Sequence, residues 1–158
     1  MIKSFLRSVL ALSLLSGTAF AADTFSIDHD HSNFFFKINH LGVSNTMGRF
    51  DDFSGSFSLD TKDPAKSNIS LTIQVASVDS NAKKRDEHLA SPDFFDAKTF
   101  PTITFVGTSY NKKSDTVFEV TGNLTIHGVT KPVTMTITKV GEGNDPWGGF
   151  RQIGRAHV

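Results

Sequence analysis

The stretch that decides the fold class is "NFFFKINH", residues 33–40. Its side chains alternate between one mainly apolar face and one mixed face. The first face carries Phe34, Phe36, Ile38 and His40, and the second carries Phe35, Lys37 and Asn39. Alternation with a period of two residues is typical of a half-buried β-strand. The phenylalanines form either an ordinary packed core, which is the commoner use of an aromatic stripe, or the wall of a ligand tunnel.

The same alternation recurs along the chain. Residues 24–28, 53–60, 68–79, 102–110, 117–126 and 133–140 all show it. Polar turns separate these stretches, at 60–68, at 111–115 and at 127–132, where Gly128 permits an unusual backbone and Pro132 is expected to stop a strand. Many short strands joined by polar loops predict an all-β sandwich or barrel.

One segment, 80–101, breaks the alternation. It has helix-forming residues, no β-branched run, and prolines at 92 and 101. We expect a short helix at 82–89 and a further turn at 93–95. Elsewhere, Gly55 and Gly122 fall on inward positions beside phenylalanines. Glycines there leave space inside a barrel, which slightly favours a cavity, although glycines also serve bends.

The first 21 residues resemble a secretory signal. Lys3 and Arg7 precede a short apolar run at 9–15, and Ala19-Phe20-Ala21 ends it. This order predicts cleavage after Ala21 and export to the periplasm. The alternative, a membrane-anchored N-terminal helix, is disfavoured because the apolar run is too short to span a bilayer.

Composition excludes several classes of function. Without Lys3 and Arg7 the chain has 14 basic and 16 acidic side chains, a net charge of −2, so no nucleic-acid surface is expected. The chain has no cysteine and no G-x-S-x-G motif, and we therefore expect no enzyme and no disulfide. In "DHDH", residues 28–31, a strand would point the aspartates and the histidines in opposite directions. That leaves too few converging ligands, so we expect no metal.

Three longer segments carry a resemblance to a known family. They are "IDHDHSNFFFKINHLGVSNTMGRFDDFSGSF" (27–57), "SVDSNAKKRDEHLASPDFFDAKTFPTITF" (77–105) and "GNLTIHGVTKPVTM" (122–135). In this order they resemble the YceI family of periplasmic lipid-binding proteins. The resemblance implies an extended antiparallel lipocalin-like β-barrel with a helical insertion near residues 82–96. It also implies an isoprenoid-type lipid, such as a polyprenyl chain or an isoprenoid quinone, as ligand and partner, and it is compatible with a homodimer.

We accordingly expect a ligand site of apolar wall residues and polar rim residues, with no further cofactor. Its members are Phe34, Phe36, Ile38, His40, Phe50, Phe57, Arg85, His88, Phe94, Phe95, Phe105 and Phe118. Arg85 and His88 either form a cationic lip for a head group or pin the helix to the barrel through a salt bridge. Two other functions stay open. One is an exported enzyme acting on a lipid through His40, Arg85 and His88, and the other is a ligand-free structural β-domain.

The C-terminal residues differ from the rest. Ile153–Val158 are what ATC GGA AGA GCA CAC GTC encodes, the start of a common sequencing adapter. We therefore expect residues 22–151 to form the barrel domain, with its closing strands missing, and Gln152–Val158 to be read-through rather than native sequence. A barrel with two unpaired edges and an opened apolar interior is expected to aggregate or to be only partly ordered.

Overall fold

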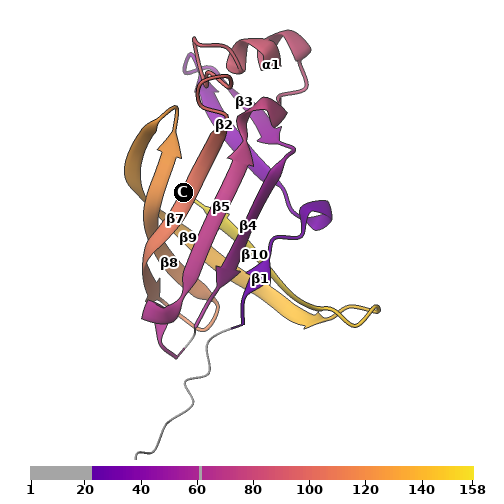
Figure 1. The fold of residues 1–158 in the computed structure, drawn as a ribbon, viewed down its shortest axis with the longest axis vertical. Helices are drawn as coiled ribbons and strands as arrows, with labels where there is room; N and C mark the ends of the chain where they lie inside the picture. Colours follow the sequence, from indigo (N-terminus) through magenta and orange to yellow (C-terminus); the bar gives the residue numbers. More distant parts are fainter. Residues whose placement is uncertain (1–22, 61) are drawn as a thin grey trace, which may run out of the picture.

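Antiparallel strands make up most of the chain (Figure 1). The computed structural model describes residues 23–60 and 62–158, so the predicted signal peptide lies outside the described residues. The strands are β1 (Phe25–Ser26), β2 (Phe34–His40), β3 (Ser44–Phe50), β4 (Phe53–Ser58), β5 (Asn68–Gln74), β6 (Val78–Asp79), β7 (Thr102–Lys112), β8 (Val117–Ile126), β9 (Val129–Asn144) and β10 (Phe150–His157). The helices are α1 (Lys83–Leu89) and three single 3₁₀ turns, η1 (His29–His31), η2 (Pro64–Lys66) and η3 (Val75–Ser77).

The strands form two sheets that follow one another around a nearly closed barrel. The larger has the order β1-β4-β5-β7-β8-β9-β10, and the smaller has the order β2-β3-β6. β3 is followed directly by β4, with Asp51 and Asp52 between them, and β5 is followed by β6 after the turn η3. The small sheet therefore continues the β4–β5 pair on the other side of a bend. On the neighbouring edge, η1 separates β1 from β2 beside the same bend. The fold class predicted from the alternation and the resemblance, an all-β lipocalin-like barrel, is therefore confirmed.

Side chains, not strand pairing, bring the two ends of the large sheet together. Strands β9 and β10 pass behind β4 and β5 (Figure 1). The ring of Phe25 on β1 lies 6.1 Å from that of Phe150 on β10. The Arg151 guanidinium forms ion pairs with Asp28 and with Asp145, the latter at 2.8 Å. These contacts complete the wall of the barrel where the backbone ladder stops.

The predicted alternation is clearest on β7 and β8 and in the first half of β2. On β8 the inward residues Phe118 and Val120 are 1% and 0% exposed. On β2, Phe34 and Phe36 are half-buried, whereas Phe35 is 67% exposed. The inward side chains therefore line a common apolar interior, as a period of two requires.

The helical insertion is also found close to where it was expected. Helix α1 covers 83–89 and a turn follows at 92–95. No helix among the described residues is long and apolar enough to cross a membrane.

Three local expectations were wrong. Residues 29–31 form η1 and not a strand, because the Asp28 carboxylate accepts the backbone N–H of Asp30 and caps the turn. The run 68–79 is broken by η3, where the barrel bends. Pro132 lies inside β9 and does not stop it. It sits in the half of β9 that β10 leaves unpaired, where a missing N–H costs no ladder bond.

The glycines do not create empty space. A side chain added at Gly122 would collide with the ring of Phe105, and one added at Gly55 would meet Leu71 and the backbone of Ser70. Neighbouring side chains and backbone thus fill the volume that the glycines leave. The expectation that these glycines favour a cavity was therefore wrong.

Candidate functional site: the apolar interior and its rim

A first cluster of apolar side chains fills the part of the barrel between β5, β7, β8 and β9. Phe105 and Phe118 are 4% and 1% exposed, and Phe57 packs against them from β4. The other members of this lower cluster are Ile69, Val120, Met135, Leu59, Leu71, Tyr110, Leu124 and Ile137. Three of the predicted wall residues are thus brought together here.

The lower cluster contains one polar group, the hydroxyl of Tyr110. This hydroxyl accepts the backbone N–H of Ile69 at 2.8 Å, one residue before β5 begins to pair with β7 at Ser70. Burial raises the pKa of Tyr110, although the hydrogen bond from Ile69 acts in the opposite direction. The hydroxyl therefore satisfies a backbone N–H within the apolar interior.

A second cluster lies on the far side of the bend, under α1. Phe50 is buried at 7% exposure, with the ring of Phe36 at 5.6 Å and that of Phe95 at 5.8 Å. The other members of this upper cluster are Val75, Val78, Ile103, Ile73, Leu89, Ala97, Leu124 and Ile126. The phenylalanine from the 92–95 turn thus reaches the same core as the phenylalanines of β2 and β3.

Leu124 belongs to both clusters and joins them into one apolar path. Several of the inward side chains along this path are only half-buried: Phe36, Phe57, Leu71, Ile73, Leu124 and Ile126. These inward side chains are still accessible to solvent, so they present apolar surface that an apolar ligand could cover. Leu124 follows the inward alternation of its strand in the sequence, but the predicted site did not include it. Apart from Ile38, that site contained only aromatic residues and polar residues of the rim.

Phe34 is placed differently from the other wall residues. Its ring lies 4.6 Å from that of Phe53, whose other neighbour is the His29 imidazole at 4.9 Å. This short stack covers the start of β2. It positions η1 over the bend and does not belong to either cluster.

Ile38 and His40, two further predicted site residues, lie at the end of the β2–β3 hairpin. Ile38 is 58% exposed and His40 is exposed as well. Both keep the alternation of β2, but the hairpin extends beyond the strands that would cover them. Among the described residues, the His40 ring has no hydrogen-bond or ion-pair partner.

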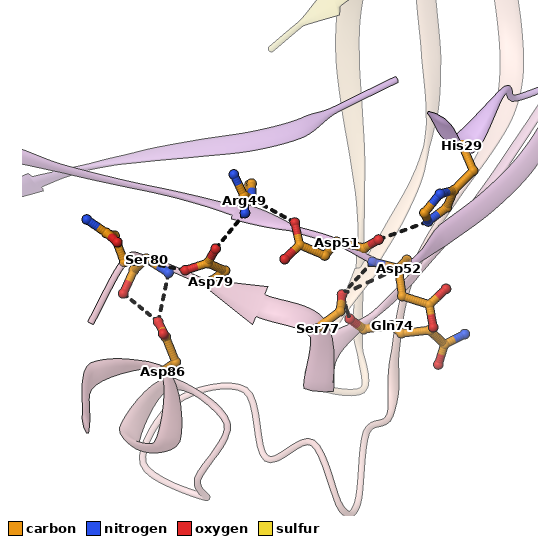
Figure 2. A network of polar contacts seen from close by, with 10 residues as sticks. His29, Arg49, Asp51, Asp52, Gln74, Ser77, Asp79, Ser80 and Asp86 are labelled. Atoms are coloured by element: carbon orange, nitrogen blue, oxygen red, sulfur yellow. Dashed lines mark hydrogen bonds and ion pairs between the residues drawn. The ribbon is translucent and has the colours of Figure 1, made fainter. Parts of the chain in front are cut away.

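On the rim, α1 is fastened by a single buried serine. Ser80 is 4% exposed. Its backbone N–H and its hydroxyl both donate to the Asp86 carboxylate, at 2.8 and 2.5 Å (Figure 2), and the Arg85 Nε donates to the same hydroxyl at 2.6 Å. These hydrogen bonds, above all the one from the Ser80 hydroxyl, lower the pKa of Asp86 from its ordinary value of 3.8. Arg85 and Asp86, neighbours that cannot face each other on a helix, thus share one partner, which sequence reasoning missed.

His88 and Phe94 lie next to each other on the outer side of the rim. The His88 Nε2 is 3.1 Å from a carboxylate oxygen of Asp93, and the rings of His88 and Phe94 meet edge to face at 4.8 Å. The His127 Nδ1 donates to the backbone carbonyl of Phe94 at 2.6 Å. The turn between β8 and β9 thereby holds the 92–95 turn in place.

A polar network follows the bend between the two clusters (Figure 2). Arg49 bridges Asp51 at 2.6 Å and Asp79 at 2.8 Å. On the other side, the Ser77 hydroxyl donates to the carbonyl of Gln74 at 2.7 Å and accepts the backbone N–H of Asp52 at 2.9 Å. The network fixes the angle at which the small sheet, and with it the rim, sits on the barrel.

In the described chain, Arg85 and His88 pair with other residues and not with each other. Arg85 bonds Ser80 and His88 bonds Asp93, and no hydrogen bond or ion pair joins any two of His40, Arg85 and His88. Among residues 23–60 and 62–158, no group of three or more histidine, aspartate or glutamate side chains could hold a metal ion. An open groove of about 550 Å³ lies between β6 and α1, outside the barrel. Its lining includes both alanines and charged side chains.

Together these features define an antiparallel β-barrel with an aromatic interior and a helical rim. The sequence model of the YceI-like domain matches residues 25–157, so the chain belongs to the YceI family, and the resemblance of its motifs is confirmed. A UPF0312 protein of Shewanella sp. (strain ANA-3) is 43% identical over 151 residues, covering 94% of this chain and 79% of that protein. The match does not test whether Gln152–Val158 are native, which stays a prediction.

Two solved structures share the fold. BcnA of Burkholderia cenocepacia superposes with a TM-score of 0.69 at 32% identity, over 74% of this chain and 73% of that one. The YCEI protein of Campylobacter jejuni superposes with a TM-score of 0.64 at 34% identity, over 81% of this chain and 75% of that one.

Proposed function

We propose that this protein binds a long apolar lipid of isoprenoid type inside the barrel and shields it from water. The observation that carries the proposal is the continuous apolar path from the lower cluster through Leu124 to the upper cluster, with half-buried side chains along it. Burial of apolar area is favourable at about 25 cal/mol per Å², so a prenyl chain along this path needs few polar contacts. Membership of the YceI family supports the same role.

The rim would then orient the ligand. Arg85, His88 and Phe94 stand where the path approaches α1, and each is exposed. A cation and an imidazole at the end of an apolar path suit an anionic or polar head group. We place the protein in the periplasm, on the strength of the predicted signal peptide, and regard it as a carrier and not as an enzyme.

The direct test is native mass spectrometry with organic extraction of protein purified from its exporting host. We expect an apolar ligand to co-purify and to be replaceable by an added polyprenol. A protein that carries no co-purified ligand and does not bind the added polyprenol would favour a ligand-free β-domain. Turnover of a lipid ester would favour the enzyme.

The head group can be tested separately. Arg85→Ala and His88→Ala should weaken binding of a polyprenyl phosphate by about fivefold to tenfold while changing binding of the free polyprenol little, because each removes one contact to an anion. Equal losses for both ligands would show that these residues only hold α1. The matched control is Lys66→Ala, which removes a cation from the exposed 3₁₀ turn η2, away from the rim.

A further inference from the structure

The tip of the β2–β3 hairpin presents apolar side chains to water. Leu41 and Val43 are each 84% exposed. The turn that carries them is ordered by local hydrogen bonds: the Asn39 side-chain oxygen accepts the N–H of Gly42 at 2.7 Å, and the Val43 N–H donates to the carbonyl of His40 at 3.2 Å. These hydrogen bonds define the backbone of the turn from which both side chains project into solvent.

Apolar side chains occupy both faces of the hairpin and not only its tip. Phe35 and Met47 are 67% and 61% exposed on one face, where Met47 pairs with Lys37. Ile38 is 58% exposed on the other face. A folded protein partner covers one face of a two-stranded ribbon, whereas a bilayer interface surrounds a ribbon that enters it. The distribution therefore suits a lipid surface better than a protein surface.

The charges of the hairpin have one sign. Residues 32–50 contain Lys37 and Arg49 and no acidic side chain. Arg49 is neutralised by Asp51 and Asp79, while Lys37 has no partner among the described residues. At the same end of the molecule, α1 exposes Lys83, Lys84 and Arg85 against one exposed acidic side chain, Glu87 (Figure 1). Unpaired cations beside an apolar tip are complementary to an anionic lipid surface.

We propose that the tip of the β2–β3 hairpin inserts into the interface of an anionic bilayer and docks the rim of the barrel on the membrane. The idea deepens the proposed function, on which its biological purpose rests, because a lipid carrier must meet a membrane to load and unload. Its test does not measure ligand binding, so the two proposals can fail separately.

The test is co-sedimentation with vesicles of phosphatidylglycerol mixed with phosphatidylcholine, compared with vesicles of phosphatidylcholine alone. We expect binding to the anionic vesicles that weakens as salt rises. The double variant Leu41→Ser, Val43→Ser should bind about tenfold more weakly, since it removes two inserted side chains. Lys37→Gln should bind about fivefold more weakly, the effect of one cation at such a surface.

A matched control is Val140→Ser. Val140 is 66% exposed and lies on β9, which pairs with β8 and β10 and not with the hairpin. This variant should bind vesicles like the unchanged chain. Equal binding by the tip variant and the unchanged chain, or equal loss in the control, would overturn the proposal. A change in sedimentation coefficient of the tip variant without vesicles would overturn it too, because it would show that the tip packs against a second copy.

Insertion itself can be observed by fluorescence. Trp147 is the single tryptophan. In a Trp147→Phe background, Val43→Trp should shift to the blue on anionic vesicles and be quenched by brominated lipid. An unshifted spectrum would contradict insertion. Binding of a soluble apolar probe to the tip variant, measured without vesicles, reports on the proposed function alone.

Discussion

Phe36 is the residue at which the wall of the proposed tunnel is easiest to test. Its ring is half-buried, lies 5.6 Å from that of Phe50, and covers the space above Gly48, where any added side chain would meet it. The side chain therefore belongs to the upper cluster without being locked into its centre. A smaller apolar side chain can be accommodated there without loss of the fold.

Phe36→Leu should lower the affinity for a polyprenol or an apolar fluorescent probe by about fivefold, because part of the aromatic contact area is lost. Circular dichroism should show an unchanged fold. Lys37→Ala, the neighbouring change on the outer face, should leave the affinity unchanged. Unchanged affinity in Phe36→Leu together with a loss in Lys37→Ala would show that the inward and outward faces of β2 are assigned the wrong way round.

Ser80 offers a second test at the scale of one side chain. It is buried and its hydroxyl links Arg85 to Asp86, so its loss leaves both groups short of a partner. Ser80→Ala should cost about 1–2 kcal/mol of unfolding free energy in urea and should increase hydrogen exchange in α1. The control is Ser54→Ala on β4, an exposed serine whose side chain makes no hydrogen bond within the described chain, and it should be neutral. Exchange that rises equally throughout the barrel would contradict a local role for Ser80.

Alternation in the sequence predicts which face a residue takes but not what covers it. Phe36 and Ile38 share a face of β2, yet one packs into the upper cluster and the other is 58% exposed. The difference depends on where the neighbouring strands end, which is a property of the assembled sheets. The hydrogen bonds that link Ser80 to Arg85 and Asp86 could not be predicted for a similar reason, because the burial of Ser80 depends on the docking of α1.

Among the elements, the tight turn between β8 and β9 places the strictest requirements on its residue types. His127 and Gly128 both have positive φ, 51° and 70°, and the Phe100 ring lies against Gly128 where a side chain would be. The same turn fixes the rim, since His127 bonds Phe94. Glycine is therefore required at position 128 both by its backbone angle and by its close neighbour.

Gly128→Ala should lower the free energy of unfolding by about 1–3 kcal/mol, through backbone strain and displacement of Phe100. Gly141→Ala is the matched change, because nothing lies within 4 Å of the space above Gly141 and its φ is not positive. It should be neutral within error. Equal destabilisation of the two variants would show that the cost lies in strand propensity and not in the turn.

Most elements were predictable because each had its own periodic signal, and the exceptions are instructive. β3 was missed because "SNTMGRF" has few apolar residues, and at its centre Gly48 makes room for a ring from β2. η1 was mistaken for a strand because capping by Asp28 competes with extended structure. β10 was not predicted because Gln152–Val158 were expected to be read-through, and its mostly exposed side chains are held only through pairing with β9.

At the scale of the whole molecule, the barrel depends on a few ion pairs where its strands do not pair. Asp28 lies on the segment after β1, while Asp145 and Arg151 come from the β9–β10 hairpin. The pKa of Asp28 is lowered from 3.8, mainly by its hydrogen bond with His31, and that of Asp145 is lowered chiefly by the backbone N–H of Gly149. Both carboxylates thus favour the folded state in their ionised form.

These shifts predict how stability depends on pH. A carboxyl group whose pKa is lower in the folded than in the unfolded chain stabilises the fold above its unfolded pKa, and that stabilisation is lost as pH falls through the folded value. The melting temperature should therefore be steady near neutral pH and fall below about pH 4. Asp28→Asn and Asp145→Asn should each lower the melting temperature at pH 7 and flatten its decline in acid. Asp23→Asn, an exposed residue without a hydrogen bond or ion pair in the described chain, should leave the whole profile in place. If the melting temperature falls equally steeply with acid in all three variants, the acid sensitivity arises elsewhere. In that case aromatic contacts such as Phe25–Phe150 hold the ends of the sheet together without help from the ion pairs.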